Sequence, residues 1–299
     1  MQRNTLNSSK IKILICCHKP CELPKDDIFL PIQVGASISN LNLGIQRDDQ
    51  INGKTCDNIS IKNKSFCELT ALYWAWKNIK KLYPDIEYIG LNHYRRYFDF
   101  NKLFFKQDSY VKPENQIPLY KINKSKLKFL LKHNYSIIPN RSTLSFSLEN
   151  QYCLAHISDD IRELRKTVKQ LYPSYNFSYE YVMTNSNLFS PYNMFILSWN
   201  DFNNYCEWLF TILFELEKKI NITYYSDSNK RIFGYMAERL FNVWIFHNKL
   251  KRHYLPVLFF GNSTKKNYLK YLYKLYQSNL AFYFSLPLLK MKIKRILFH

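Results

Sequence analysis

The side chains best suited to chemistry directly follow one short apolar segment. Residues 88–91 predict a buried strand, after which come His93, Tyr94, Arg95 and Arg96. Period-two alternation would place His93 and Arg95 on one face, and Tyr94 and Arg96 on the other. Two guanidiniums and an imidazole repel one another unless an anion neutralises them, and the guanidinium fork matches phosphate oxygens. The cluster therefore predicts a diphosphate site, unless Arg95 and Arg96 pair with carboxylates of the protein's own surface.

A helix should precede this strand and hold it in place. Ser65 and Glu68 have the S-x-x-E spacing of a capping box, and apolar residues recur at i, i+3, i+4 and i+7 from Leu69. Pro84 should end the helix, because proline lacks a backbone donor and restricts its predecessor. The strand then delivers its polar cluster to the carboxyl end, where open α/β sheets bind ligands.

A first strand is predicted over residues 11–17, and His18 and Lys19 follow it. Both are candidate nucleotide contacts, since a Rossmann-like sheet binds nucleotides at this end. The chain has neither G-x-G-x-x-G nor G-x-x-x-x-G-K-[ST], which excludes dinucleotide-binding and P-loop sites of the usual type. The seven cysteines lack paired metal spacing. Cys17, His18 and Cys21 suggest zinc, but Cys16 and Cys17 at the end of a strand are expected to be small core residues, so no metal site is predicted.

Longer motifs around this unit resemble the DUF4422 family of bacterial capsular and surface polysaccharide glycosyltransferases. They are DNIS, CELTALYWAWKN, YIGLNHYRRYF, YNMF, CEWLFTILFELE and RIFGYMAERLFNVW, in the family's order from about residue 10 to about residue 247. The resemblance implies a GT-A-like fold and transfer of a galactofuranosyl or hexosyl group from a nucleotide-diphosphate sugar, expected to be UDP-linked. The implied acceptor is a lipid-linked oligosaccharide in capsule, O-antigen or exopolysaccharide synthesis.

A polar loop over residues 44–58 carries several carboxylates. Such a loop could hold a ribose or a sugar, or it could be solvated surface, as we expect for Asp48. The candidate donor contacts in this region are Asp49, Asp57, Asn58 and Ser60.

Two candidates for the reaction and acceptor side come from the middle of the chain. His156 and Asp160 are spaced i to i+4 in a region, 147–172, that reads as largely helical, so the carboxylate could orient an acid or base. His156 also matches a family position, although a surface His-Asp pair is the alternative. Asn193 opens an apolar run and could bind a sugar hydroxyl, or could simply be a turn residue.

A further helix is predicted over residues 229–248. Arg231, Tyr235, Glu238 and Asn242 fall on one of its faces as a polar stripe. Glu238 is either a structural partner of the neighbouring arginine or the general base that an inverting transfer requires. Arg231 is a candidate substrate contact, and Gly234 would allow close approach of a ligand or backbone.

Many GT-A nucleotide-sugar transferases hold a divalent cation with a D-x-D motif, and this sequence has none. The nearest pattern, Asp85-Ile86-Glu87, precedes its strand and so lies at the wrong end of the sheet. We therefore expect fixed cations, Arg95 and Arg96, to stabilise the departing nucleoside diphosphate. No cofactor follows from the residues, and Mn²⁺ or Mg²⁺ stays open.

The length and composition allow one large folded domain or two small ones, and with the family resemblance we expect one α/β domain followed by a basic tail. The chain has 299 residues, 46% hydrophobic residues and a formal net charge of +20. We expect residues 1–9 to be flexible and residues 10–263 to form a Rossmann-type mixed sheet flanked by helices. Residues 264–299 contain eight Lys and Arg and no Asp or Glu.

This tail is predicted to dock on an anionic membrane. Its longest apolar run, residues 280–289, is well short of the ~20 residues that span a bilayer. A basic amphipathic helix then predicts peripheral attachment to the inner membrane face, in a cytoplasmic protein without a secretory signal. Nucleic-acid binding is the rival explanation of the charge and aromatics, but the aliphatic cluster after Asn279 favours acyl chains. A non-catalytic polysaccharide-assembly scaffold is the other alternative.

Overall fold

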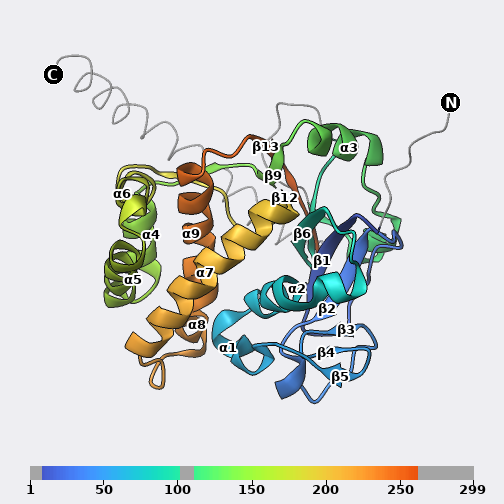
Figure 1. Ribbon diagram of the computed structural model, residues 1–299, viewed down its shortest axis with the longest axis horizontal. Helices are drawn as coiled ribbons and strands as arrows, with labels where there is room; N and C mark the ends of the chain where they lie inside the picture. The colour runs from blue at the N-terminus through green and yellow to red at the C-terminus, as the bar shows by residue number, and fades with distance from the viewer. Residues whose placement is uncertain (1–8, 102–110, 262–299) are drawn as a thin grey trace.

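The structure is a computed structural model that describes residues 9–101 and 111–261 (Figure 1). The expected flexible segment 1–9 lies almost wholly outside the described residues, as does the predicted amphipathic tail 264–299. Within the described ranges no helix is long and apolar enough to cross a membrane.

A mixed sheet lies at the centre, with the strand order β13-β9-β12-β6-β1-β2-β3. The strands are β1 (Ile11–Cys17), β2 (Phe29–Gln33), β3 (Gln46–Arg47), β6 (Tyr88–His93), β9 (Ser136–Pro139), β12 (Phe195–Ser198) and β13 (Arg252–Leu255). Strand β1 is parallel to β2 and β6, whereas β12 is antiparallel to β6 and β9. The carboxyl ends of β1 and β6 therefore meet at one edge of the sheet.

Side chains of β1 alternate between two hydrophobic cores, as the pleat of a strand requires. Leu14 and Cys16 pack in a core with α2 (Leu69–Leu82), α7 (Trp199–Lys219) and α9 (Ile232–His247). Ile13 and Ile15 pack in a second core on the opposite face, with α3 (Lys124–Lys132). Both faces of β1 are covered, which explains its continuous apolar sequence. In β6, a Cβ on Gly90 would lie 3.0 Å from the carbonyl oxygen of Phe195, so the pairing with β12 requires glycine.

The remaining elements extend this framework. Helices α4 (Leu148–Ala155), α5 (Ser158–Leu171) and α6 (Asn176–Thr184) stand together beside α7 and α9 (Figure 1). The short helices are α1 (Asn63–Phe66), α8 (Asp227–Lys230) and the 3₁₀ turns η1 (Ala36–Ile38), η2 (Ser60–Lys62), η3 (Glu114–Leu119) and η4 (Pro173–Tyr175). Two small ribbons are β4 (Gln50–Ile51) with β5 (Lys54–Thr55), and β10 (Ser142–Thr143) with β11 (Leu188–Phe189). The predicted α/β class, a Rossmann-type mixed sheet flanked by helices, is confirmed.

The chain reverses direction immediately after β6. Tyr94 and Arg95 form a turn, and β7 (Arg96–Phe98) runs back antiparallel, with His93 opposite Arg96. Strand β7 then pairs with β14 (Val257–Phe260), which also pairs with β8 (Val111–Lys112). The predicted alternation of a single strand is therefore wrong. Directly opposed residues of an antiparallel pair share a face, so the hairpin places His93 and Arg96 together.

The capping box predicted before α2 is also wrong. Helix α1 ends at Phe66, Cys67 adopts φ 52° and ψ −128°, and α2 begins at Leu69 with no side-chain cap. The Ser65 hydroxyl donates instead to the carbonyl of Lys62 at 3.2 Å. The predicted end of the helix before Pro84 is confirmed, since α2 stops at Leu82.

Candidate functional site

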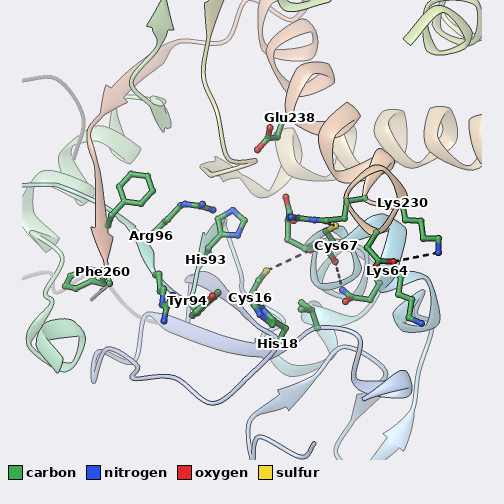
Figure 2. A pocket seen from close by; sticks show the side chains of 18 residues that line it. Cys16, His18, Lys64, Cys67, His93, Tyr94, Arg96, Lys230, Glu238 and Phe260 are labelled. Atoms are coloured by element: carbon green, nitrogen blue, oxygen red, sulfur yellow. Dashed lines mark hydrogen bonds and ion pairs between the residues drawn. The ribbon is translucent and has the colours of Figure 1, made fainter. Parts of the chain in front are cut away.

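A cavity of about 1150 Å³ opens beyond the carboxyl ends of β1 and β6 (Figure 2). Its sheet-side wall consists of residues that follow these strands: Cys16, His18, His93, Tyr94, Arg95 and Arg96. The opposite wall comes from the α1–α2 turn and from α9, with Cys67, Glu68, Arg231 and Glu238. The lining is completed by Val34, Asn63, Lys64, Asp227, Lys230 and residues 259–261. Basic groups therefore face a small number of carboxylates across one concave space.

His93 is held by the backbone of a neighbouring turn. Its Nε2 lies 2.6 Å from the carbonyl oxygen of Tyr192, which can only accept a hydrogen bond, so Nε2 carries a proton. Burial lowers the pKa of His93, and the charges of Arg96 and Arg231 lower it further, while Glu68 opposes them. The imidazole is therefore neutral near pH 7, with Nδ1 unprotonated.

The two arginines of the hairpin have different surroundings. Arg95 forms an ion pair with Glu114 of η3. This arginine therefore pairs with a carboxylate of the protein itself, which is the alternative that the sequence left open. The Arg96 guanidinium lies 4.8 Å from the ring centroid of Tyr192 and 5.4 Å from that of Phe259. Among the residues that the structure describes, Arg96 has no carboxylate partner. Its charge is therefore available to an anion in the cavity.

Helix α9 contributes a base candidate and a third arginine. Glu238 points from α9 toward the cavity, above Arg96 and His93 in Figure 2. Its Oε1 accepts a hydrogen bond from the backbone N–H of Tyr192 at 3.1 Å. Burial raises the pKa of Glu238 from 4.5 to about 7, and the charge of Glu68 adds to the effect. Arg231 lies at the mouth, and its Nε is 3.4 Å from Cys67 Sγ. A carboxyl group that titrates near pH 7 suits general acid–base chemistry.

The close approach predicted at Gly234 is confirmed. A Cβ at this position would lie 3.3 Å from both Cβ and Sγ of Cys67. The glycine thus lets the α1–α2 turn pack directly on α9. This contact brings Glu68 and Glu238, from segments far apart in the sequence, to the same cavity.

Comparison with known proteins agrees with this geometry. Residues 12–249 match the family model DUF4422, described as a domain of unknown function. The chain belongs to the DUF4422 family. Among solved structures, this DUF4422 chain is similar to the apo structure of the bifunctional glycosyltransferase WbbM, with a TM-score of 0.69 and 29% identity. The match covers 85% of this chain and 46% of the WbbM chain, so the DUF4422 chain spans less than half of that protein. No curated protein matches it.

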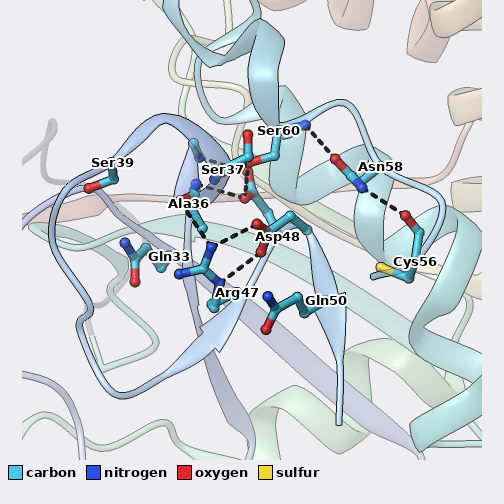
Figure 3. A network of polar contacts seen from close by, with 12 residues as sticks. Gln33, Ala36, Ser37, Ser39, Arg47, Asp48, Gln50, Cys56, Asn58 and Ser60 are labelled. Atoms are coloured by element: carbon cyan, nitrogen blue, oxygen red, sulfur yellow. Dashed lines mark hydrogen bonds and ion pairs between the residues drawn. The ribbon is translucent and has the colours of Figure 1, made fainter. Parts of the chain in front are cut away.

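Several predicted site residues of this DUF4422 chain lie outside the cavity lining. Asp49 pairs with Arg47 at 2.7 Å, and the Asp57 carboxylate accepts a hydrogen bond from the Tyr73 hydroxyl at 3.1 Å. The Asn58 side chain bonds to the backbone of Ser60 and Cys56 (Figure 3). Asp49, Asp57 and Asn58 thus have partners within the protein, and their contact with a donor stays a prediction.

Asp48, expected at the surface, is fully buried. Its carboxylate accepts hydrogen bonds from the backbone N–H groups of Gly35 and Ala36, at 2.7 and 3.0 Å. It also accepts one from the Ser60 hydroxyl at 2.5 Å (Figure 3). Ser60, predicted as a donor contact, is thus bonded to Asp48. The expectation for Asp48 is wrong because a carboxylate with several donors can be buried.

The predicted pairing of His156 with Asp160 is wrong. The helix breaks at residues 156–157, so His156 ends α4 while Asp160 belongs to α5. The imidazole stacks on Tyr235 at 4.2 Å, and Asp160 accepts a hydrogen bond from the Tyr225 hydroxyl at 2.7 Å. His156 does not line the cavity, and the structure offers no support for a catalytic role.

Lys19 and Asn193 also lie outside the lining, but both contact it. The Lys19 ammonium lies 5.7 Å from the Tyr94 ring centroid. Asn193 is 3% exposed, and its Nδ2 donates to Glu68 Oε1 at 2.7 Å and to the Gly234 carbonyl at 3.2 Å. Because its amide donor is used by the protein, Asn193 does not bind a sugar through that group.

The important residue that the sequence did not reveal is Glu68. The S-x-x-E spacing gave it a local capping role, whereas in the structure its carboxylate lines the cavity. The contact that distinguishes this role from capping is the hydrogen bond from Asn193, which lies 125 positions away in the sequence. Four further lining residues were missed as well, because single charged or thiol side chains in turns and in helices of four residues carry no periodic signal: Lys64, Cys67, Asp227 and Lys230.

A metal ion in this cavity would need several His, Cys, Asp or Glu ligands. Across residues 9–101 and 111–261, no group of three or more His, Cys, Asp or Glu side chains is arranged to hold a metal ion. Glu68 and Glu238 instead each accept a hydrogen bond from the 192–193 turn.

Proposed function

We propose that this DUF4422 protein is a glycosyltransferase that uses a nucleotide-diphosphate sugar. The observation that carries the proposal is Arg96, a cation without a carboxylate partner in the described chain, at the end of the central strand opposite Glu238. Similarity to a bifunctional glycosyltransferase at 29% identity supports the same class of reaction. The donor that we propose is UDP-linked, and the group transferred is galactofuranosyl or another hexosyl.

Cations around the cavity would bind the donor diphosphate. Arg96 and Arg231 line the space from opposite walls, and His18 lies at the end of β1. Burial lowers the pKa of His18, as do the charges of Lys19, Arg231 and Arg95, so this imidazole is a neutral donor or acceptor near pH 7. Fixed guanidiniums stabilise negative charge as it develops on the leaving group, without any rearrangement during the reaction.

The transfer itself is a displacement at the anomeric carbon. The bond from this carbon to the diphosphate oxygen breaks, and its electron pair stays on that oxygen, facing Arg96. The hydroxyl oxygen of the acceptor forms the new bond to the anomeric carbon. Its proton passes to the carboxylate of Glu238, which serves as general base. The products are the glycosylated acceptor, the nucleoside diphosphate and a protonated Glu238.

The acceptor that we propose is a lipid-linked oligosaccharide of a surface polysaccharide. It is motivated by the basic sequence of residues 264–299, with eight Lys and Arg. Such a segment would hold the enzyme on the anionic inner face of the cell membrane, where a lipid-linked acceptor is found. A peripheral, cytoplasmic location follows from this proposal.

A panel of nucleotide sugars tests the donor class. UDP-galactofuranose, UDP-galactose, UDP-glucose and GDP-mannose would be scored for thermal stabilisation and for donor hydrolysis, with and without EDTA. A ligand at about 100 times its Kd should stabilise the native state by roughly 2.7 kcal/mol. We expect at least one UDP-sugar to stabilise and be hydrolysed in EDTA. Stabilisation by single-stranded nucleic acid but by no nucleotide sugar would contradict the proposal. Activity that requires added manganese would contradict the role of the fixed guanidiniums in stabilising the leaving group.

A further inference from the structure

One two-residue turn holds three ionisable groups of the cavity. The carbonyl of Tyr192 accepts from His93 Nε2 at 2.6 Å, and the N–H of Tyr192 donates to Glu238 Oε1 at 3.1 Å. The side chain of Asn193 donates to Glu68 Oε1 at 2.7 Å. Both turn residues have left-handed backbones, with φ 80° at Tyr192 and φ 52° at Asn193. Tyrosine rarely adopts this region, and such strain concentrates at functional sites.

The Asn193 side chain is oriented in one direction only. Its Nδ2 lies between two acceptors, Glu68 Oε1 and the Gly234 carbonyl, so the amide cannot be reversed without facing oxygen against oxygen. The residue is 3% exposed, and its Oδ1 has no partner in the described part of the chain. A buried polar atom without a partner costs stability. The orientation of the Asn193 amide therefore indicates that this side chain serves to place Glu68, in spite of its unpaired oxygen.

The two carboxylates stand in different local environments. Glu68 precedes the first residue of α2, a helix of 14 residues, where the helix dipole stabilises negative charge. Among the described side chains only Asn193 donates to the Glu68 carboxylate, which leaves its second oxygen for a ligand. Glu238 lies inside α9 and receives one hydrogen bond, from the Tyr192 backbone. Two carboxyl groups with opposed environments are a recurrent basis for separate catalytic roles.

The charged groups around Glu238 come from several elements. Glu68 faces it from the α1–α2 turn, Arg96 from β7 and His93 from β6. Arg231 and Arg239 belong to its own helix, but the Arg239 guanidinium already bonds to Gln151 and to the Tyr235 carbonyl. Glu68 raises the pKa of Glu238, and Arg239 and Arg96 lower it. An ionised Glu68 thus favours the protonated form of its neighbour.

We propose that Glu68 is a second catalytic carboxylate that faces the transferred sugar, that Glu238 takes the acceptor proton, and that Asn193 is the positioning residue that holds Glu68. This rests on the proposed glycosyltransferase function. As the bond to the diphosphate lengthens and its electron pair moves to the phosphate oxygen, positive charge develops at the anomeric carbon. The Glu68 carboxylate forms no covalent bond and stabilises that charge until the acceptor oxygen bonds to the carbon.

The kinetic test uses Glu68→Gln, which keeps the acceptor for Asn193 but removes the charge. With the best donor of the UDP-sugar panel, kcat should fall about 10²-fold or more, while the Kd for UDP changes less than about 3-fold. Asn193→Ala should lower kcat about 10-fold. Adding it to Glu68→Gln should cost little more, since Asn193 acts through the Glu68 charge. Additive losses in the double variant would overturn the positioning role.

A second readout does not depend on the donor. The side-chain carboxyl carbon of Glu238 would be followed by NMR against pH and assigned by its loss in Glu238→Gln. In Glu68→Gln its midpoint should move down from the value of about 7, because a neighbouring negative charge is gone. Glu217→Gln is the matched control, since Glu217 pairs with Lys62 outside the cavity, and it should leave the midpoint unchanged.

The two readouts separate this inference from the proposed function. An unmoved Glu238 midpoint together with normal turnover in Glu68→Gln would overturn the carboxylate pair and leave the glycosyltransferase proposal intact. A midpoint that moves in a protein that hydrolyses no nucleotide sugar would overturn the proposed function, and with it the sugar-facing role of Glu68.

Discussion

Arg95 and Arg96 are neighbours in one motif, but in the described part of the chain only Arg95 is neutralised by a carboxylate, that of Glu114. Glu114 pairs with Arg95, whereas Arg96 stacks between Tyr192 and Phe259 and keeps its charge for the cavity. The residue type alone predicted the same role for both. The difference arises from the 3₁₀ turn η3, which carries Glu114 and which no pattern of residues predicted beside Arg95.

The Arg96 guanidinium should therefore contribute far more to turnover than that of Arg95. We expect Arg96→Ala to lower kcat/KM for the donor about 10²–10³-fold, and Arg95→Ala less than about 10-fold. Arg96→Lys should restore little, since an ammonium neither stacks nor binds phosphate through two nitrogens. Arg141→Ala is the control, because Arg141 also stacks on a tyrosine, Tyr254, but outside the cavity lining. Equal losses at positions 95 and 96 would contradict the assignment.

Burial of Glu238 should make the stability of the protein depend on pH. The pKa of Glu238 rises from 4.5 in the unfolded chain to about 7 in the folded protein. The stabilisation by its bound proton is complete below about pH 4.5 and is lost as pH rises through about 7. Glutamine does not titrate, so Glu238→Gln should gain stability over the parent across this range, by roughly 2–3 kcal/mol.

Urea unfolding at several pH values measures this difference directly. The gain of Glu238→Gln should be small near pH 4 and reach its maximum above about pH 7.5. Donor turnover of the parent should rise with pH through about 7, because a general base must be ionised, and it should be lost in Glu238→Gln. An active-site group can reduce stability while it serves the reaction. A stability difference that stays constant with pH would contradict the raised pKa.

At the scale of elements, apolar patterning predicted much of the framework. The strands β1 and β6 and the helices α2 and α9 lie where the apolar pattern placed them. The errors occur where tertiary contacts decide. Residues 94–95 turn although they read as strand, and the helix over 147–172 breaks at residues 156–157. Cys67 takes a backbone conformation that local sequence disfavours, because α9 packs against it.

The contact between Gly234 and Cys67 yields a prediction at this scale. In a helix interior, Gly→Ala gains up to about 1 kcal/mol, but here the new methyl would lie 3.3 Å from Cys67 Cβ and Sγ. Overpacking of this kind costs about 1–3 kcal/mol. We therefore expect Gly234→Ala to destabilise the protein and to lower turnover, since the displaced turn carries Glu68.

Cys67→Gly should reverse the sign of that effect. It removes both contacted atoms, and it suits φ 52° with ψ −128°, a conformation that costs other residues about 1–3 kcal/mol. In this background Gly234→Ala should stabilise the protein by roughly 1 kcal/mol. The four free energies of unfolding form a double-variant cycle. The same effect of Gly234→Ala in both backgrounds would show that the contact is not the cause.

At the scale of the whole molecule, the site could not have been assembled from the sequence. Its lining runs from Cys16 to Gly261 and joins strand ends, the α1–α2 turn, α9 and β14. The strand-end cluster was predicted because the carboxyl ends of parallel strands converge. The pairing of Glu68 with Asn193, and of Cys67 with Gly234, depends on how the helices pack on the sheet. No periodic signal encodes such contacts between distant segments.

The charge of the whole chain bears on where the enzyme works. Residues 264–299 carry eight of the basic residues and no acidic ones. If this segment docks on the membrane, the full chain should co-sediment with vesicles containing anionic phosphatidylglycerol and not with purely zwitterionic ones. Binding should fall steeply as salt is raised to about 0.5 M, where the Debye length shrinks to a few ångströms.

Substitutions of equal charge distinguish a local docking segment from the net charge of +20. Replacing Lys290, Lys292, Lys294 and Arg295 with Gln should weaken vesicle binding on the order of 10²–10³-fold, at about 1 kcal/mol for each basic residue. The matched control replaces four exposed lysines of the domain, Lys54, Lys132, Lys166 and Lys249, and removes the same charge. Equal losses of vesicle binding in both variants would mean that the membrane is attracted by the net positive charge of the whole protein. Only a loss confined to the tail variant would mean that residues 264–299 bring the cavity to a lipid-linked acceptor.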